Sequence, residues 1–188
     1  MKILMICPSL QIRSEWLFTL VNNLREDIAC VATNEPNLER IDLPQHSLNP
    51  FYSKIIRRLG EGINQQYTYT VILNSLEKNY KTSLNYVHFL SFAVNFKKFI
   101  LNSANPTVIH CHGKDIMWNL KKFETGEFVY SNTYFNDVKE LGKHAYFIAN
   151  SNFTKDQLLK IGIKESRIVI NHFGVELKEE EKKITDDI

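Results

Sequence analysis

The sequence has no long hydrophobic run and little excess charge, and each of these absences excludes a class of protein. Its longest apolar segments have the length of strands and fall short of the length that a bilayer-spanning helix needs. The formal net charge of +2 is too small to indicate a nucleic-acid partner. The first residues lead directly into a strand-like run that stops at Pro8, so we expect no secretory leader and a cytoplasmic protein.

Cysteine is scarce, and Cys7, Cys30 and Cys111 form no Cys-x-x-Cys pair. Each lies in or beside an apolar run, which favours three reduced thiols in the core. A different class of function, an enzyme that uses Cys7 or Cys111 as a nucleophile with a histidine, requires a partly exposed thiol of low pKa. The apolar surroundings argue against it.

The 188 residues, 44% of them hydrophobic and 23% charged, suffice for one soluble domain with a substantial core. Short apolar runs alternate with amphipathic segments, and this order predicts an α/β fold. We expect a Rossmann-like, doubly wound, mainly parallel sheet of about six or seven strands, with helices on both faces. The predicted strands are residues 2–7, 28–32, 107–112, 127–131, 146–149 and 167–170.

Residues 145–176 show this organisation most clearly. The run 146–149 has no polar alternation, as expected of a strand that is covered on both faces. Asn150, Ser151 or Asn152 can then cap a helix whose apolar residues are Phe153, Leu158, Leu159 and Ile161. Gly162 suits the left-handed position after that helix. With the strand at 167–170, the segment predicts a right-handed βαβ unit.

This segment resembles the end of the N-terminal domain of family-4 glycosyltransferases of the GT-B fold. The resemblance rests on Ile148-Ala149-Asn150-Ser151, on the "LxxxGI" pattern at 158–163 and on the "NGVD"-like turn at 171–176. The run 107–112 resembles the "DVVHxH" strand of the same domain. The resemblance implies a single lobe of a GT-B fold over residues 1–176, followed by a charged tail or linker at 177–188.

For function, the resemblance implies the acceptor-side lobe of a retaining, metal-independent glycosyltransferase. Such an enzyme moves a sugar from a nucleotide-sugar donor to a glycan or lipid-linked acceptor, and we expect this lobe to be inactive alone. A second domain or chain would bind the donor. No Asp-x-Asp occurs in the sequence, in agreement with the metal-independent class and with the absence of a cofactor. The alternative is a non-catalytic binding or regulatory subunit that pairs with a separate donor-binding chain.

Two departures from the family pattern favour this alternative. The loop after the first strand has no glycine, and Arg13 can replace the lost backbone contact or remain a solvated surface cation. Thr133 stands where the family has a histidine, and a hydroxyl does not replace an imidazole in proton transfer.

Ligands of open α/β sheets gather at the carboxyl ends of the strands. The candidate residues in these loops are Ser9, Arg13, Ser14, Glu15, His112, Gly113, Asn132, Thr133, Asn150, Ser151, Asn171 and Gly174. His112 is the best single candidate, as a contact to sugar hydroxyls or as a general base. Alternation along the strand turns His110 and His112 to one side, but two histidines without a third ligand make a weak zinc site, so we expect no metal.

The middle of the chain is less informative. Residues 34–50 have the composition of a loop, and the aromatic residues at 65–102 fall at helical spacing, which predicts two helices. Residues 51–60 form a short amphipathic pattern with three cations. Its two interpretations are a core-packing helix with a solvated basic face, which we favour, and a peripheral contact with the inner face of the membrane.

Overall fold

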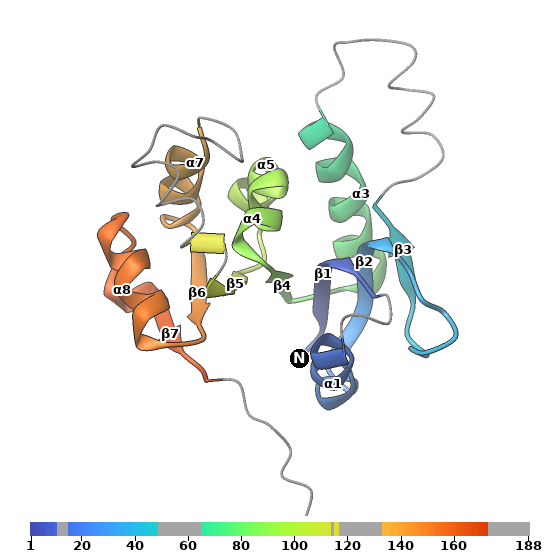
Figure 1. The fold of residues 1–188 in the computed structure, drawn as a ribbon. Coiled ribbons are helices and arrows are strands. Elements are labelled where there is room, and N and C mark those ends of the chain that lie inside the picture. Colours follow the sequence, from blue (N-terminus) through green and yellow to red (C-terminus); the bar gives the residue numbers. More distant parts are fainter. Residues whose placement is uncertain (11–14, 49–64, 114, 117–132, 173–188) are drawn as a thin grey trace, which may run out of the picture.

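The computed structural model describes residues 1–10, 15–48, 65–113, 115–116 and 133–172 (Figure 1). Seven strands in these ranges form one sheet in which every pair is parallel, in the order β3-β2-β1-β4-β5-β6-β7. The strands are β1 (Ile3–Ser9), β2 (Ile28–Glu35), β3 (Gln45–Ser47), β4 (Leu84–His88), β5 (Thr107–Cys111), β6 (Ala145–Ala149) and β7 (Ile168–Ile170). The predicted Rossmann-like parallel sheet is confirmed.

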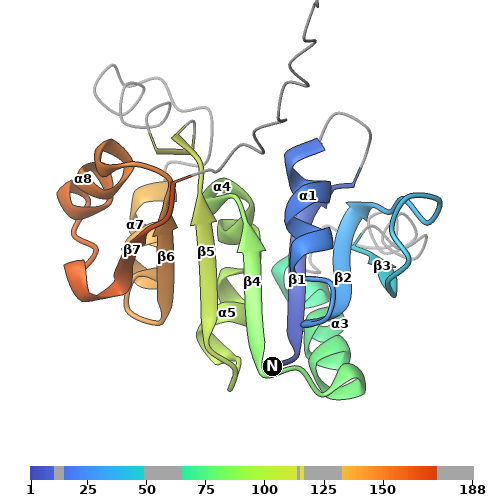
Figure 2. The same cartoon turned by 90° about the horizontal axis from the view of Figure 1, so that it is seen from below.

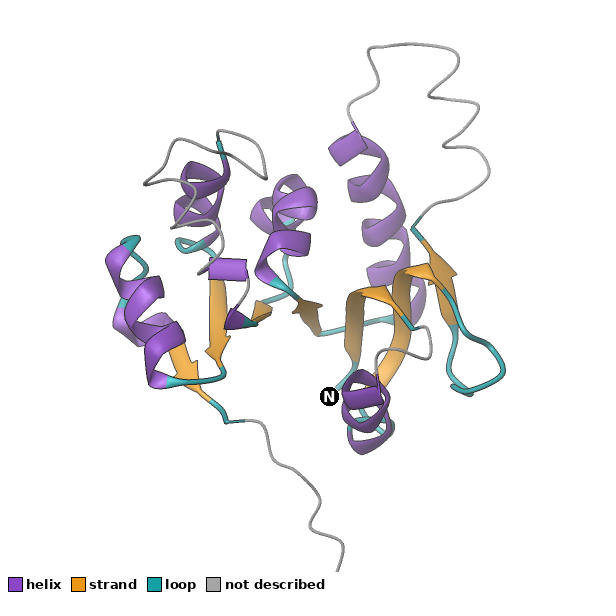
Figure 3. Ribbon diagram, in the orientation of Figure 1, coloured by secondary structure: helices purple, strands orange, loops and turns teal. Residues whose placement is uncertain are grey.

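Helices cover both faces of this sheet, as predicted. The helices are α1 (Glu15–Asn23), α3 (Gln65–Tyr80), α4 (Leu90–Ala93), α5 (Lys97–Asn102), α7 (Tyr134–Leu141) and α8 (Asn152–Lys160). Figure 2 shows α1 in front of the sheet and α3, α5 and α7 behind it. The layers of helix and strand are also distinguished by colour in Figure 3. None of the helices in the described ranges is long and apolar enough to cross a bilayer.

Alternation along the strands divides the interior into two cores. Leu4 and Ile6 of β1 point into the larger core, which also contains the fully buried Phe147. Ile3 and Met5 point the other way, into the smaller core beneath α1. The alternation of a strand therefore decides which helix layer each side chain meets.

Two strands were not expected from the sequence. Residues 34–50 contain β3 as well as loop, and residues 65–102, predicted as two helices, contain β4 between α3 and α4. The aromatic residues of this region gave the helical spacing, but Tyr86 belongs to β4 and is buried against the smaller core. The predicted strand at 127–131 and the predicted helix at 51–60 lie outside the described residues.

The unit β6-α8-β7 forms as predicted. Ser151 is the N-cap of α8, and its hydroxyl accepts a hydrogen bond from the backbone N–H of Thr154 at 3.1 Å. Gly162 follows the helix with φ of 93°, a conformation that strains any residue with a side chain.

The burial expected for this unit is wrong at three positions. Phe153 is 50% exposed, and Thr154, Gln157 and Leu158 form the buried face of α8 instead. Tyr146 and Val169, at 45% and 59% exposure, show that β6 and β7 are not covered on both faces. The reason is that α1 is the single described helix on that side, and it packs beside β1 and β2.

The two phenylalanines of this unit provide a matched test of the packing. We expect Phe147→Ala to lower the free energy of unfolding by about 3–5 kcal/mol, because it opens a cavity in the larger core. Phe153→Ala is the control, with an expected change of about 1 kcal/mol or less. Urea denaturation of both variants measures the difference, and equal losses would contradict the assigned burial.

Candidate functional site

The candidate site lies where the connections of the sheet change direction. From β1 the chain moves outward to β2 and β3, then returns through α3 to β4 on the other side of β1. The carboxyl ends of β1, β4 and β5 meet at the same edge, where open α/β sheets bind their ligands. Ser9 ends β1, His88 ends β4 and His112 follows β5.

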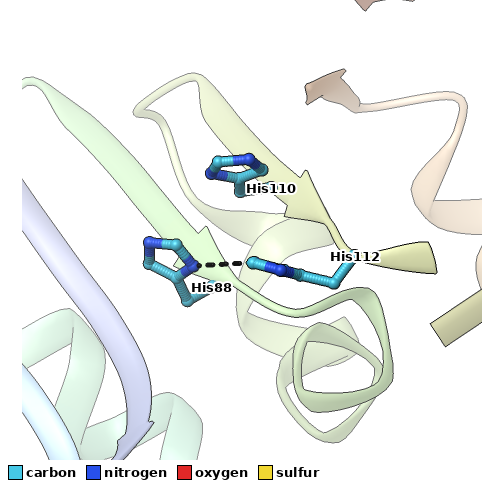
Figure 4. Close-up of side chains that lie close together, drawn as sticks. All are labelled: His88, His110 and His112. Atoms are coloured by element: carbon cyan, nitrogen blue, oxygen red, sulfur yellow. Dashed lines mark hydrogen bonds between the residues drawn. The ribbon is translucent and has the colours of Figure 1, made fainter. Parts of the chain in front are cut away.

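Three histidines converge at this edge (Figure 4). His88 pairs with His110 in the register of β4 and β5, and alternation places His112 on the same side as His110. The Nε2 atom of His112 lies 3.3 Å from Nδ1 of His88. The ring centroid of His110 lies 5.1 Å from that of His88 and 4.9 Å from that of His112. The three rings therefore form one contiguous cluster.

Tyr86 and Phe89 hold this cluster from either side. The hydroxyl of Tyr86 lies 2.7 Å from Nδ1 of His110, and both side chains are buried. The ring of Phe89 packs on His112 with centroids 4.3 Å apart. Phe89 has φ of 71°, an uncommon and strained conformation for a bulky residue. Its N–H donates to the carbonyl of His110, which ties the strained residue to β5.

Asp115 joins the two segments that leave β4 and β5. Its carboxylate accepts hydrogen bonds from the backbone N–H groups of Leu90 and His112, at 3.0 and 3.2 Å, and from the hydroxyl of Ser91 at 2.9 Å. Burial raises the pKa of this carboxyl, and the three hydrogen bonds oppose that rise. The loops that carry Phe89 and His112 are thus fixed relative to each other.

Burial also determines the charge of the cluster. Desolvation lowers the pKa of His110 to about 4. Desolvation, followed by the neighbouring His110, lowers the pKa of His112 to about 4 as well. The pKa of His88 falls well below its usual value, again mainly through burial. All three imidazoles are neutral at pH 7, and each then offers one N–H donor and one nitrogen acceptor. Such groups can pair with hydroxyls, move a proton or coordinate a metal ion.

Of the predicted site residues, the structure places His112 and Gly113 in this cluster region and Ser9 at the neighbouring end of β1. The others have different positions. Asn150 and Ser151 serve the N-terminus of α8, where the Asn150 side chain accepts a hydrogen bond from the Thr154 hydroxyl at 2.6 Å. Asn171 is exposed and donates its N–H to Ala149.

Thr133 is exposed at the start of α7, where its hydroxyl donates to the carboxylate of Asp137 at 2.8 Å. Glu15 is the first residue of α1. Arg13, Ser14, Asn132 and Gly174 lie outside the described residues.

Sequence reasoning missed His88, Tyr86, Phe89 and Asp115. The third histidine that was absent from the zinc argument is His88, and it was hidden because β4 was taken for helix. The available signal was the short run Tyr86-Val87-His88 after the polar break at 81–83, which parallels Val108-Ile109-His110.

The cysteines do not form a nucleophilic site. All three are free and buried, as predicted. Burial raises the pKa of Cys7 to about 12, against a weaker opposing hydrogen bond from Thr33, and raises that of Cys111 well above its usual value. The thiolate that a cysteine nucleophile requires is therefore suppressed.

A hollow of about 540 Å³ lies between the ends of α7 and α8. Its cations are Lys139, Lys143, Lys160, Lys164 and Arg167. They precede β6 and β7 or lie in the last turns of the two helices, where positive charge offsets the helix dipole. This hollow is at the amino ends of the strands, opposite the histidine cluster.

The histidine cluster predicts an acid-sensitive fold. An imidazole whose pKa is lower in the folded state binds fewer protons there, so stability falls as the pH drops from about 6.5 towards 4. At about 1.4 kcal/mol for each pKa unit, His110 alone accounts for about 3 kcal/mol.

Urea denaturation between pH 7.5 and 4.5 measures this loss, and His110→Gln should make the dependence shallower. His144→Gln, at an exposed position, is the control that should keep the original slope. Identical slopes for the parent chain and His110→Gln would contradict the role of burial.

No protein-family model and no curated protein matches this sequence. Among solved structures, HepE of Anabaena in complex with UDP-glucose aligns with 94% of this chain and 44% of its own, with a TM-score of 0.65 and 18% identity. HepE with UDP gives a TM-score of 0.63 and 15% identity, and HepE with UDP and glucose gives 0.64 and 18%; each covers 94% of this chain and 45% of HepE. The chain thus has the fold of less than half of HepE.

Proposed function

We propose that this chain is the acceptor-side lobe of a GT-B glycosyltransferase, which transfers a sugar from a nucleotide-sugar to a glycan or lipid-linked acceptor. The observation that carries the proposal is the likeness to HepE over 94% of this chain. HepE has been crystallised with UDP-glucose and with UDP and glucose together, the two parts into which glycosyl transfer divides such a donor.

The chemistry of the cluster suits the acceptor side of such a reaction. Sugar hydroxyls both donate and accept hydrogen bonds, as neutral imidazoles do. His112 is the best placed of the three, because it is partly exposed at the strand's carboxyl end and packs on Phe89. In this role His112 binds an acceptor hydroxyl, and its second nitrogen contacts His88, which can receive or return a proton.

The donor side requires different groups. A leaving diphosphate is stabilised by positive charge. The proposal assigns the donor phosphates to a second domain or chain, in keeping with a match to less than half of HepE. The retaining course, the lobe boundary at residue 176 and the cytoplasmic location stay predictions from the sequence.

A non-catalytic binding subunit is the second candidate, and Thr133 favours it. The resemblance places a histidine at this position, whereas the Thr133 hydroxyl is engaged with Asp137. Transfer activity of the complete complex separates the two functions. A catalytic lobe should lose at least tenfold in rate on His112→Gln, and a binding subunit should keep its rate.

Binding by the isolated chain tests the proposal directly. We expect calorimetry with UDP, GDP, UDP-glucose and GDP-mannose at millimolar concentration to give no heat. We expect glucose-containing oligosaccharides to shift the amide NMR signals of Phe89, His112 and Gly113 and to leave those of Gly142 and Ile163, at the opposite end, unchanged. His112→Ala should weaken this binding about three- to tenfold, the value of a typical hydrogen bond.

The control for that variant is His144→Ala, which removes an exposed imidazole far from the edge. Clear binding of one nucleotide to the lone chain would overturn its assignment as the acceptor-side lobe. Saccharide shifts that cluster away from His112 would overturn the assignment of the site.

A further inference from the structure

A cluster of histidines at the interior of a small domain is unusual, because imidazoles are polar. His88 and His110 are 0% and 4% exposed, and each lies on a strand position where an aliphatic side chain would add hydrophobic stabilisation. Burial of these two imidazoles costs free energy that packing alone does not require.

The nitrogens of the three histidines lie near the spacing of metal ligands. In a tetrahedral zinc centre with Zn–N bonds of 2.0–2.1 Å, two ligand nitrogens lie about 3.4 Å apart. The contact of 3.3 Å between His112 and His88 already has this length. One ligand nitrogen from each of the three histidines lies within 4.8 Å of the other two, so the widest separation exceeds the ideal by about 1.4 Å.

We propose that His88, His110 and His112 bind one zinc ion at the carboxyl edge of β4 and β5, with the fourth coordination position open. Imidazole ligands suit Zn²⁺ and exclude Mg²⁺ and Ca²⁺, which prefer oxygen. Three protein ligands with an open position are typical of zinc sites that bind water or a substrate atom. The proposal rests on the geometry of the cluster and does not require the proposed sugar transfer.

The residues around the cluster supply the second shell that such a site needs. The Tyr86 hydroxyl contacts Nδ1 of His110, which assigns Nε2 of His110 to the ion. The carboxylate of Asp115 accepts from the backbone N–H of His112 and so holds that residue at the edge.

One ring has to turn for the site to close. The rings of His110 and His112 are stacked at 28°, whereas an ion must lie in the plane of each ring that binds it. His110 is fixed by its strand and by Tyr86, so the partly exposed His112 makes the adjustment. Its partial exposure makes His112 the most informative ligand to replace.

The test is metal uptake by the full-length chain, with any purification tag removed and after dialysis against a chelator. We expect one equivalent of Zn²⁺ by calorimetry and a rise in Tm of several degrees at saturating Zn²⁺. Co²⁺ used as a probe should give the visible absorption of a tetrahedral nitrogen site. His88→Gln, His110→Gln and His112→Gln should each weaken binding at least 100-fold.

Two further variants show that the effect belongs to the cluster. His46→Gln removes a histidine of β3 that, like His112, is partly buried. This variant should leave the affinity for Zn²⁺ unchanged. Tyr86→Phe keeps the ring and removes the hydroxyl that orients His110, so affinity should fall about 10–100-fold.

Several results would overturn the proposal. They are no uptake at micromolar Zn²⁺, unchanged affinity in His112→Gln, and a Co²⁺ spectrum with thiolate charge-transfer bands, which would place the metal on the cysteines. Circular dichroism checks folding, and if His88→Gln or His110→Gln unfolds, His112→Gln and Tyr86→Phe decide the matter. No sugar or nucleotide takes part, so failure here leaves the proposed glycosyl transfer unaffected.

Discussion

The pairing of β4 with β5 sets His88 directly opposite His110, and the candidate site depends on this register. Because side chains alternate along a strand, a slip of one residue in β4 would turn His88 away from His110 and towards the larger core. The same alternation carries His112 to the side of His110. Beyond the ends of β4 and β5, backbone hydrogen bonds between the strands no longer fix the two segments relative to each other. The Asp115 carboxylate links them there, because it accepts hydrogen bonds from the backbone N–H groups of Leu90 and His112.

The backbone at this edge of the sheet is strained at one residue, Phe89. Phe89 occupies a positive φ, and the chain turns there from β4 directly into α4. A bulky residue in this conformation persists only where its surroundings hold it. The carbonyl of His110 and the ring of His112 provide that support. The free energy that offsets this strain comes from other parts of the fold. The larger core contributes to it, since Phe96, Phe99 and Phe147 are fully buried there.

Sequence reasoning predicted the fold better than the site, for a physical reason. Strands rich in apolar residues show as apolar runs, and the turn chemistry of Ser151 and Gly162 marks the ends of α8, so β1, β2, β5, β6 and α8 were recognisable. In β4, Asn85 and His88 interrupt the apolar run. Asn85 is nevertheless buried, because its amide donates to Glu77 and Ser103, and such tertiary hydrogen bonds leave no trace in a local pattern. Without β4, His88 had no place beside His110.

The two proposals make different electrostatic demands on the same edge. Neutral imidazoles offer hydrogen bonds without charge, which suits an uncharged sugar and leaves the diphosphate to another domain. A bound Zn²⁺ would bring two positive charges to this edge of the sheet. An ion there could hold a hydroxyl oxygen of the acceptor in its open position. The metal independence implied by the family resemblance would then hold only for the donor side of the reaction. His112 would bind the ion and would not transfer a proton.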